Sequence, residues 1–155
     1  MADVGAGDGY FTFRLADAVG EKGKVLATDI DAKALKRVED RARRDRRANV
    51  QTVVSEPTHT KLDDASLDAA FMCDVIHHVP KDQRLPLVKD IARALKPGGF
   101  FFLIDWREKA DVSCDRDRRI PLEDLIKVGT DAGLVLDAEF HYLKWQVFLR
   151  FRKPE

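Results

Sequence analysis

The feature that most constrains the fold is a glycine-rich turn near the start of the chain. Three glycines in Gly5–Gly9 separate a short apolar segment, Met1–Val4, from Tyr10–Val19, whose apolar residues recur with the period of a helix. Glycine lets the backbone turn sharply and lets a ligand approach closely, and the helix that follows presents free N–H groups at its N-terminus. The pattern indicates either a tight strand–helix turn or a ligand-binding loop at the start of an α/β unit.

Strand and helix patterns then alternate along the chain. Further strands are predicted at residues 24–28, 50–54, 67–72, 100–104, 134–143 and 146–152. Three helices are predicted between them. The first runs from a cap at Asp31 to Asn49. The second begins between Pro80 and Pro86 and stops at 97–99, and the third spans 122–132. Such alternation is typical of an α/β domain with a mostly parallel sheet, and the two-residue link before the last strand implies an antiparallel hairpin. A length of 155 residues indicates one domain, residues 1–155.

Composition disfavours several classes of protein. Lys plus Arg and Asp plus Glu number 27 each, so the formal net charge is zero and a nucleic-acid partner is not expected. A hydrophobic fraction of 45% excludes a disordered chain. There is no apolar run that could span a bilayer and no signal peptide, which predicts a cytoplasmic protein without a membrane partner. Cys73 and Cys114 have no metal-binding spacing, so no metal site is expected.

Acidic residues end two of the predicted strands. Ligands of parallel sheets bind beyond the carboxyl ends of the strands, so these positions are candidates for a binding site. Asp29 lies 22 residues after Gly7, and a carboxylate there can accept both hydroxyls of a ribose. The alternative is a helix cap, although Asp31 is better placed for that. Glu56 could accept from an adenine amino group, or it could be a solvent-exposed loop acid.

Several motifs together resemble class I S-adenosylmethionine-dependent methyltransferases, especially the small-molecule type with a His-His pair after the fourth strand. They are Gly5–Gly9, Asp29–Ile30, Leu67–His78, Leu95–Gly99 and the final hairpin, in that order. The resemblance covers essentially the whole chain. It implies S-adenosyl-L-methionine as the cofactor and a Rossmann-like α/β fold. That fold has a seven-stranded, mostly parallel sheet, helices on both faces, and a C-terminal hairpin whose last strand alone is antiparallel.

The resemblance also implies which residues bind the cofactor. The methionine half would lie against Asp3, Gly5, Ala6 and Gly7. The ribose hydroxyls would be held by Asp29. The turn would hold a sulfonium ligand with a carboxylate, not a pyrophosphate. Such a ligand does not need the third glycine of the Rossmann pattern GxGxxG, which agrees with the pattern GxGxG found here.

Four further positions complete the implied cofactor site. Ile30 would pack on the adenine, Glu56 would accept from its amino group, and the backbone at Cys73 would face the methionine ammonium. Pro57 departs from the family pattern, because the residue there often donates its backbone N–H to the adenine ring and proline has none. We expect binding to survive the loss of one hydrogen bond, about 0.5–1.5 kcal/mol.

The candidate catalytic residues follow the fourth strand. His78 and Asp74 are placed there with His77, and one histidine could act as a base or orient an acceptor. The alternative is that one histidine caps the loop while the other packs, because methyl transfer often needs only alignment of the reactants. Asp105 and Trp106 follow the fifth strand, where Trp106 could line an acceptor pocket or pack on the surface.

Two regions leave alternatives open. Lys36–Arg47 carries seven basic residues interleaved with acids, which is typical of a solvated helix face but could bind an RNA phosphate. The first strand has little sequence before the glycine turn, where family members usually have a covering helix. A shortened chain, a natural minimal enzyme or a lid from a partner would each account for this. Because the neighbouring strands would lack partners along part of their length, we expect a homo-oligomer.

Three functions compete. A methyltransferase that acts on a small-molecule substrate agrees best with the motifs. A module that binds S-adenosylmethionine without its own catalysis is the first alternative. An RNA or protein methyltransferase is the second alternative. The zero net charge disfavours a nucleic-acid methyltransferase. So does the sequence Cys73–Ile76, because nucleic-acid enzymes carry an Asn/Asp-Pro-Pro-aromatic motif at this place.

Overall fold

The computed structural model describes residues 1–110 and 116–155, so Cys114 lies outside the described part. The strands are β1 (Ala2–Val4), β2 (Val25–Asp29), β3 (Val50–Val54), β4 (Leu67–Cys73), β5 (Leu95–Trp106), β6 (Val135–Phe140) and β7 (Gln146–Arg152). The helices are α1 (Tyr10–Val19), α2 (Ala32–Arg44), α3 (Lys81–Ala94) and α4 (Leu122–Asp131), with short 3₁₀ turns η1 (Ile76–His78) and η2 (Arg116–Arg118).

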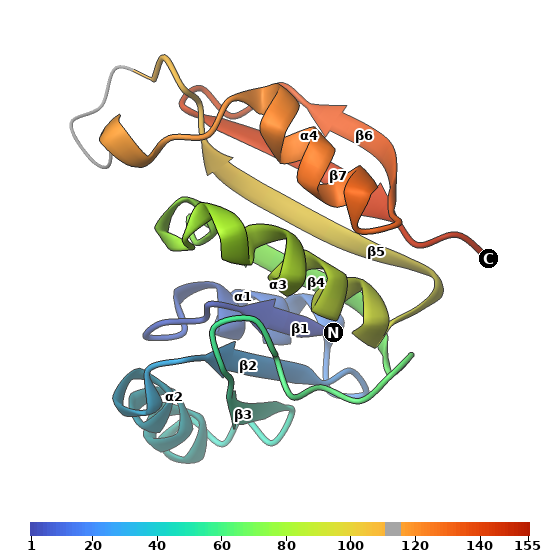
Figure 1. Ribbon diagram of the computed structural model, residues 1–155. Coiled ribbons are helices and arrows are strands. Elements are labelled where there is room, and N and C mark those ends of the chain that lie inside the picture. The colour runs from blue at the N-terminus through green and yellow to red at the C-terminus, as the bar shows by residue number, and fades with distance from the viewer. Residues whose placement is uncertain (111–115) are drawn as a thin grey trace.

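The described strands form one sheet of seven, in the order β3-β2-β1-β4-β5-β7-β6 (Figure 1). Neighbours from β3 to β5 are parallel, whereas β7 is antiparallel to both β5 and β6. The predicted fold class is therefore confirmed, including the single antiparallel strand. β2 lies on one side of β1 and β4 on the other, so the direction of strand order reverses at β1. Parallel sheets bind ligands at such a reversal.

Helices cover both faces of the sheet and make two cores. α3 and α4 lie on the face turned toward the viewer in Figure 1, over β1, β4, β5 and β7. α1 and α2 pack against β2 and β3 from the opposite face. Side chains alternate between faces along β1, so Ala2 and Val4 join the first core while Asp3 points toward α1.

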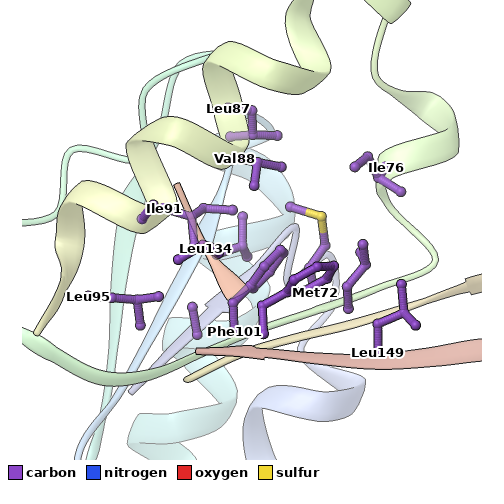
Figure 2. Packing of buried hydrophobic residues seen from close by; sticks show 14 of the residues in the cluster. Met72, Ile76, Leu87, Val88, Ile91, Leu95, Phe101, Leu134 and Leu149 are labelled. Atoms are coloured by element: carbon purple, nitrogen blue, oxygen red, sulfur yellow. The ribbon is translucent and has the colours of Figure 1, made fainter. Parts of the chain in front are cut away.

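The larger core is closely packed around aromatic rings. Figure 2 shows Met72, Ile91 and Phe101 meeting between the sheet and α3. The rings of Phe101 and Phe151 are fully buried and stack with centroids 6.1 Å apart. Burial of each such side chain stabilises the fold by about 1.5–3 kcal/mol.

Two predicted helix ends are wrong by a few residues. α3 ends at Ala94 rather than at Pro97–Gly99, because Leu95 already has extended backbone and pairs with Leu67 of β4. β5 consequently begins before Phe100, with an irregular register at its start. α2 ends at Arg44 rather than Asn49. The cap that was expected for α2 is present, since the Asp31 carboxylate accepts from the Lys33 N–H at 2.8 Å.

Candidate functional site

A cavity of about 350 Å³ opens beyond the carboxyl ends of β1, β2, β3 and β4. Seven of the predicted site residues lie in its wall: Gly5, Asp29, Ile30, Glu56, Pro57, Asp74 and His78. Four others do not line it: Asp3, Ala6, Gly7 and Cys73. The structure thus brings together strand ends that are far apart in sequence.

The wall also contains residues that the motifs did not indicate. Val4, Ser55, Thr60, Val75, Val79, Pro80, Gln83 and Leu87 complete it. Ser55 directly precedes Glu56 at a strand end, so its position could have suggested it. Gln83 and Leu87 lie one helical turn apart in α3, and their place in the wall depends on how α3 packs.

The glycine turn is held by backbone bonds to β2. The N–H groups of Gly5 and Ala6 both donate to the carbonyl of Thr28, at 2.8 and 3.0 Å. Gly5 has a φ of +74°, and a Cβ there would lie 2.4 Å from Cγ2 of Val75. Only glycine therefore lets β1 approach the turn after β4 so closely.

Asp29 holds the glycine turn and the start of α2 together. Its Oδ2 accepts from the Gly7 N–H at 2.8 Å, and its Oδ1 accepts from the Asp31 N–H at 2.9 Å. A carboxylate has about four acceptor sites, so two backbone bonds leave capacity for hydroxyl groups in the cavity. Gly7 thus contributes to the wall through its bond to Asp29, and Ala6 contributes through its bond to the Thr28 carbonyl.

Asp3 lies buried beneath the turn, 3% exposed, where the Thr12 hydroxyl donates to its Oδ2 at 2.6 Å. Burial raises the pKa of Asp3 to about 6, while the Thr12 bond partly opposes that shift. At neutral pH the group is mostly ionised, so it places a buried negative charge behind the turn. Such a charge favours a cation nearby.

Asp74 has a φ of +56°, which is uncommon for a residue other than glycine. Nε2 of Gln146 donates to both of its carboxylate oxygens, at 3.0 and 2.8 Å, from β7, 72 residues further along. Burial raises the pKa of Asp74, and the Gln146 bond opposes that shift. Burial also raises the pKa of the neighbouring Cys73 thiol, which keeps the sulfur protonated and unreactive.

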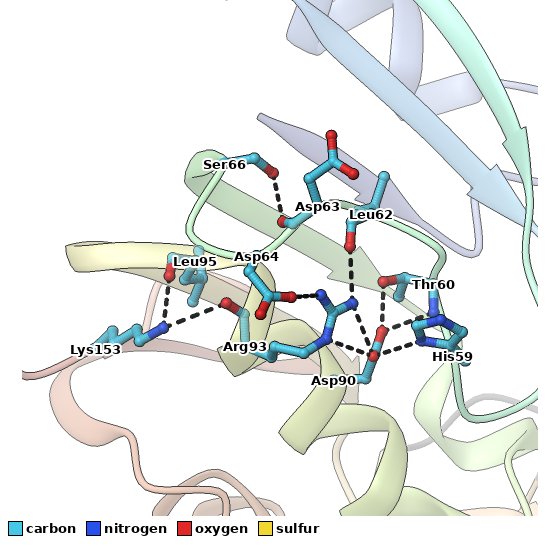
Figure 3. A network of polar contacts seen from close by, with 10 residues as sticks. All are labelled: His59, Thr60, Leu62, Asp63, Asp64, Ser66, Asp90, Arg93, Leu95 and Lys153. Carbon is cyan, nitrogen blue, oxygen red and sulfur yellow. Dashed lines mark hydrogen bonds and ion pairs between the residues drawn. The ribbon is translucent and has the colours of Figure 1, made fainter.

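The loop that carries Glu56 is anchored to α3 through Asp90 (Figure 3). Asp90 Oδ2 accepts from the backbone N–H and the hydroxyl of Thr60 at 2.7 and 2.5 Å, and Oδ1 lies 2.7 Å from His59 Nδ1. Arg93 donates to Asp90 and to the carbonyl of Leu62. Since Thr60 lines the cavity, this network determines where one wall stands.

Glu56 itself is exposed, and its carboxylate lies 3.0 Å from Nζ of Lys61. The hydrogen bond from Lys61 lowers the pKa of Glu56, so the group is an anion and an acceptor at neutral pH. Pro57 follows it in the wall without an N–H to offer.

His77 and His78 have different surroundings. The His77 ring is buried, and its Nδ1 lies 2.7 Å from Oδ1 of Asp105. His78 is exposed at the cavity, and its Nδ1 lies 2.9 Å from Nη1 of Arg118. The ring centroids of the two histidines are 4.0 Å apart. Trp106 is half-buried and is not part of the cavity wall.

The basic residues of Lys36–Arg47, the segment of α2 and the turn after it, are largely neutralised by neighbouring acids. Lys36, Arg43 and Arg44 pair with acids of the same segment, and Arg37 and Arg47 pair with acids near α1. Exposed pairs of this kind contribute little stability, but they leave little free charge for a phosphate. This supports a solvated helix face.

Comparison with known proteins agrees with this geometry. Residues 1–99 match the model of a family described as a methyltransferase domain. Over 76% of its length the chain is 28% identical to an arsenite methyltransferase of Halobacterium salinarum. Over 68% it is 31% identical to the ubiquinone/menaquinone biosynthesis C-methyltransferase UbiE of Brucella anthropi. The chain spans only 30% and 40% of the lengths of these two relatives.

A solved structure is similar over nearly the whole chain. The crystal structure of an S-adenosylmethionine-dependent methyltransferase from Aquifex aeolicus superposes with a TM-score of 0.89, at 24% identity, over 97% of this chain and 80% of that one. This similarity shows the fold. Among the described helices, no segment is both long and apolar enough to cross a membrane.

Proposed function

The chain belongs to the methyltransferase domain family of class I S-adenosylmethionine-dependent methyltransferases, and from this we propose that it methylates a small-molecule acceptor. One observation carries the proposal. The cavity joins Gly5, Asp29, Ile30 and Glu56 from three strand ends at the point where strand order reverses. Proteins with parallel sheets bind nucleoside cofactors at this point.

The residues present fit the nucleoside half of S-adenosyl-L-methionine. Asp29 offers acceptor capacity for the two ribose hydroxyls. Ile30, 64% exposed, offers an apolar surface for the adenine, and Glu56 an anionic acceptor for its amino group. Pro57 removes one donor, which we expect to weaken adenine binding without abolishing it.

The other end of the cavity suits the charges of the methionine half. The sulfonium and the ammonium are cations, and buried Asp3 lies behind the glycine turn as an anion at neutral pH. Asp74 adds a second carboxylate in the wall beyond β4. When bound, the cofactor supplies an electrophilic methyl group. The chain's own contribution is to hold the acceptor in line with it and to exclude water.

We further propose that the acceptor lies beside His78 and Asp74. Both residues line the cavity after β4, next to the position proposed for the methionine half. Two relatives support a small acceptor, because one is an arsenite methyltransferase and the other a ubiquinone/menaquinone biosynthesis C-methyltransferase. The ion pairs of the segment Lys36–Arg47 support the same choice over an RNA substrate.

Two measurements test this function. Calorimetry with S-adenosylhomocysteine measures cofactor binding, and transfer of a radiolabelled methyl group into cell extract, separated into small-molecule, protein and RNA fractions, identifies the acceptor class. We expect binding and label in the small-molecule fraction. Binding without transfer would support a non-catalytic module, and label in protein or RNA would overturn the small-molecule assignment.

A further inference from the structure

Arg118 contacts His78 at the cavity. Nη1 of Arg118 lies 2.9 Å from Nδ1 of His78, although the two residues are 40 positions apart. A guanidinium has only donors and stays protonated at any ordinary pH, so Nδ1 must be the acceptor in this bond. A neutral imidazole carries its proton on the other nitrogen, which here is Nε2.

The His78 ring is held from its other side as well. It packs on the His77 ring with centroids 4.0 Å apart, at an interplanar angle of 42°. His77 is fixed in turn by Asp105, whose Oδ1 lies 2.7 Å from the ring Nδ1 and whose Oδ2 accepts from the backbone N–H at 3.3 Å. Asp105 is 1% exposed, so this anchor lies inside the protein. We therefore regard Asp105 as a positioning residue.

The charges around the cavity are divided between its two sides. Asp29 and Glu56 follow β2 and β3, which lie on one side of β1. On the other side of β1, His78 and Asp74 follow β4, and Arg118, from the η2 turn after β5, contacts His78. Both oxygens of Asp74 are bonded to Gln146. The nucleoside half of the cofactor suits the first side, and a donor next to a guanidinium suits an anion on the second.

We propose that Arg118 holds His78 as a hydrogen-bond donor through Nε2–H, and that the pair selects acceptors with an anionic oxygen beside the methylated atom. This rests on the proposed function and names the substrate class of the same site. His78 then recognises the acceptor rather than removing its proton, because in this tautomer Nδ1 is occupied and Nε2 is protonated. A carboxylate, phenolate or enolate oxygen meets the requirement.

The tautomer can be measured directly. In ¹⁵N-histidine NMR spectra, with His78 assigned by its loss in His78→Gln, we expect the Nε2–H form of a neutral ring. Arg118→Gln should shift the Nδ1 resonance. Arg116→Gln, which removes the same charge from the same turn next to a different hollow, should not. An Nδ1–H tautomer, or an Nδ1 resonance unmoved by Arg118→Gln, would overturn the proposal.

Selectivity is tested with two probes that differ in charge. In protein saturated with S-adenosylhomocysteine, we expect 2-hydroxybenzoate to bind about tenfold more tightly than 2-hydroxybenzamide, which is the effect of one charge-assisted hydrogen bond. Arg118→Gln should remove this preference and Arg116→Gln should keep it. Equal affinities, no binding of either probe, or a preference that survives Arg118→Gln would contradict the proposal.

The experiments distinguish a failure of the methyltransferase function from a failure of the proposed role of Arg118 and His78. If S-adenosylhomocysteine does not bind, the methyltransferase function fails, whereas the tautomer and the probe titrations in the free protein still decide the role of Arg118. If the cofactor analogue binds normally and the histidine spectra give the other tautomer, the function stands and the recognition of an anion falls.

Discussion

The backbone N–H of Gly7 donates to Oδ2 of Asp29 at 2.8 Å, across 22 residues of sequence. The carboxylate proposed to bind ribose therefore also holds the glycine turn, while its second oxygen accepts from Asp31. The shape of the turn and the proposed binding of ribose thus involve the same side chain. A substitution at Asp29 should consequently affect both.

We expect Asp29→Ala to weaken S-adenosylhomocysteine binding by about 1.5–3 kcal/mol, because a charge-assisted bond is lost and the hydroxyls go unpaired. Calorimetry measures this. The matched control is Asp31→Ala, which removes the α2 cap and about 1 kcal/mol of stability but no group of the cavity wall. Unchanged affinity in a folded Asp29→Ala protein would refute the assignment.

Asp3 predicts a pH-dependent stability. Burial raises its folded-state pKa to about 6, above the ordinary 3.8, so the folded state binds the proton more tightly than the unfolded state. The stability that protonation contributes is complete below pH 3.8 and is lost as the pH rises through 6. Above that, the ionised group destabilises the free protein by up to about 3 kcal/mol.

Asp3→Asn should therefore be more stable than the wild type at pH 8, with a gain that shrinks as the pH falls toward 5. The amide oxygen can still accept from Thr12. Urea unfolding at several pH values measures the gain, and Asp8→Asn, on an exposed carboxylate, is the control. We expect the same substitution to weaken cofactor binding, because the buried anion is lost. A pH-independent difference would contradict this account.

Asp90 should govern the wall that carries Thr60. Burial alone would raise its pKa, but hydrogen bonds from Thr60, His59 and Arg93 outweigh burial and lower it. Asp90→Asn should lower stability at neutral pH by about 2–3 kcal/mol, because buried donors lose a charged acceptor. The difference should diminish as the pH falls through the lowered pKa of Asp90.

Hydrogen exchange provides the local test of that network. Amides of residues 56–62 should exchange faster in Asp90→Asn, and adenosine should bind more weakly. Asp64→Asn is the control, because Asp64 also pairs with Arg93 but is largely exposed. If the loop kept its protection in Asp90→Asn, the anchor would have to lie elsewhere.

Gly5 and Gly7 offer a matched pair. A Cβ at Gly5 would lie 2.4 Å from Val75 Cγ2, whereas a Cβ at Gly7 would have no atom of the described residues within 4 Å. Both have positive φ, at +74° and +51°. Gly7→Ala should cost only the backbone strain, about 1–2 kcal/mol, and Gly5→Ala clearly more.

The double variant Gly5→Ala/Val75→Ala removes both methyl groups that would clash. We expect Gly5→Ala to lower the stability less in the Val75→Ala background than in the wild type. Thermal unfolding of the four proteins measures this difference. Additive losses would mean that the two residues do not press on one another, contrary to the geometry.

Local pattern was sufficient for much of this protein. The helix period in Tyr10–Val19, the cap at Asp31 and the acids at strand ends are set by neighbours within a few residues, so they could be identified without a structure. The order of elements then led to the α/β fold with its one antiparallel strand, which the sheet confirms. The end of α3 was misplaced because the pairing of Leu95 with Leu67 depends on the sheet.

Contacts between distant segments were decided only by the tertiary structure. Gln146 reaches Asp74 across 72 residues, Arg118 reaches His78 across 40, and nothing in either local sequence indicates the partner. The physical reason is that strand order and register determine which side chains meet. The local hydrophobic period of a segment indicates a helix or a strand, but it does not specify the segment's partner. The sequence alone thus determined which elements form and which strand ends carry the residues of the proposed site, whereas packing decided what each charged group there faces.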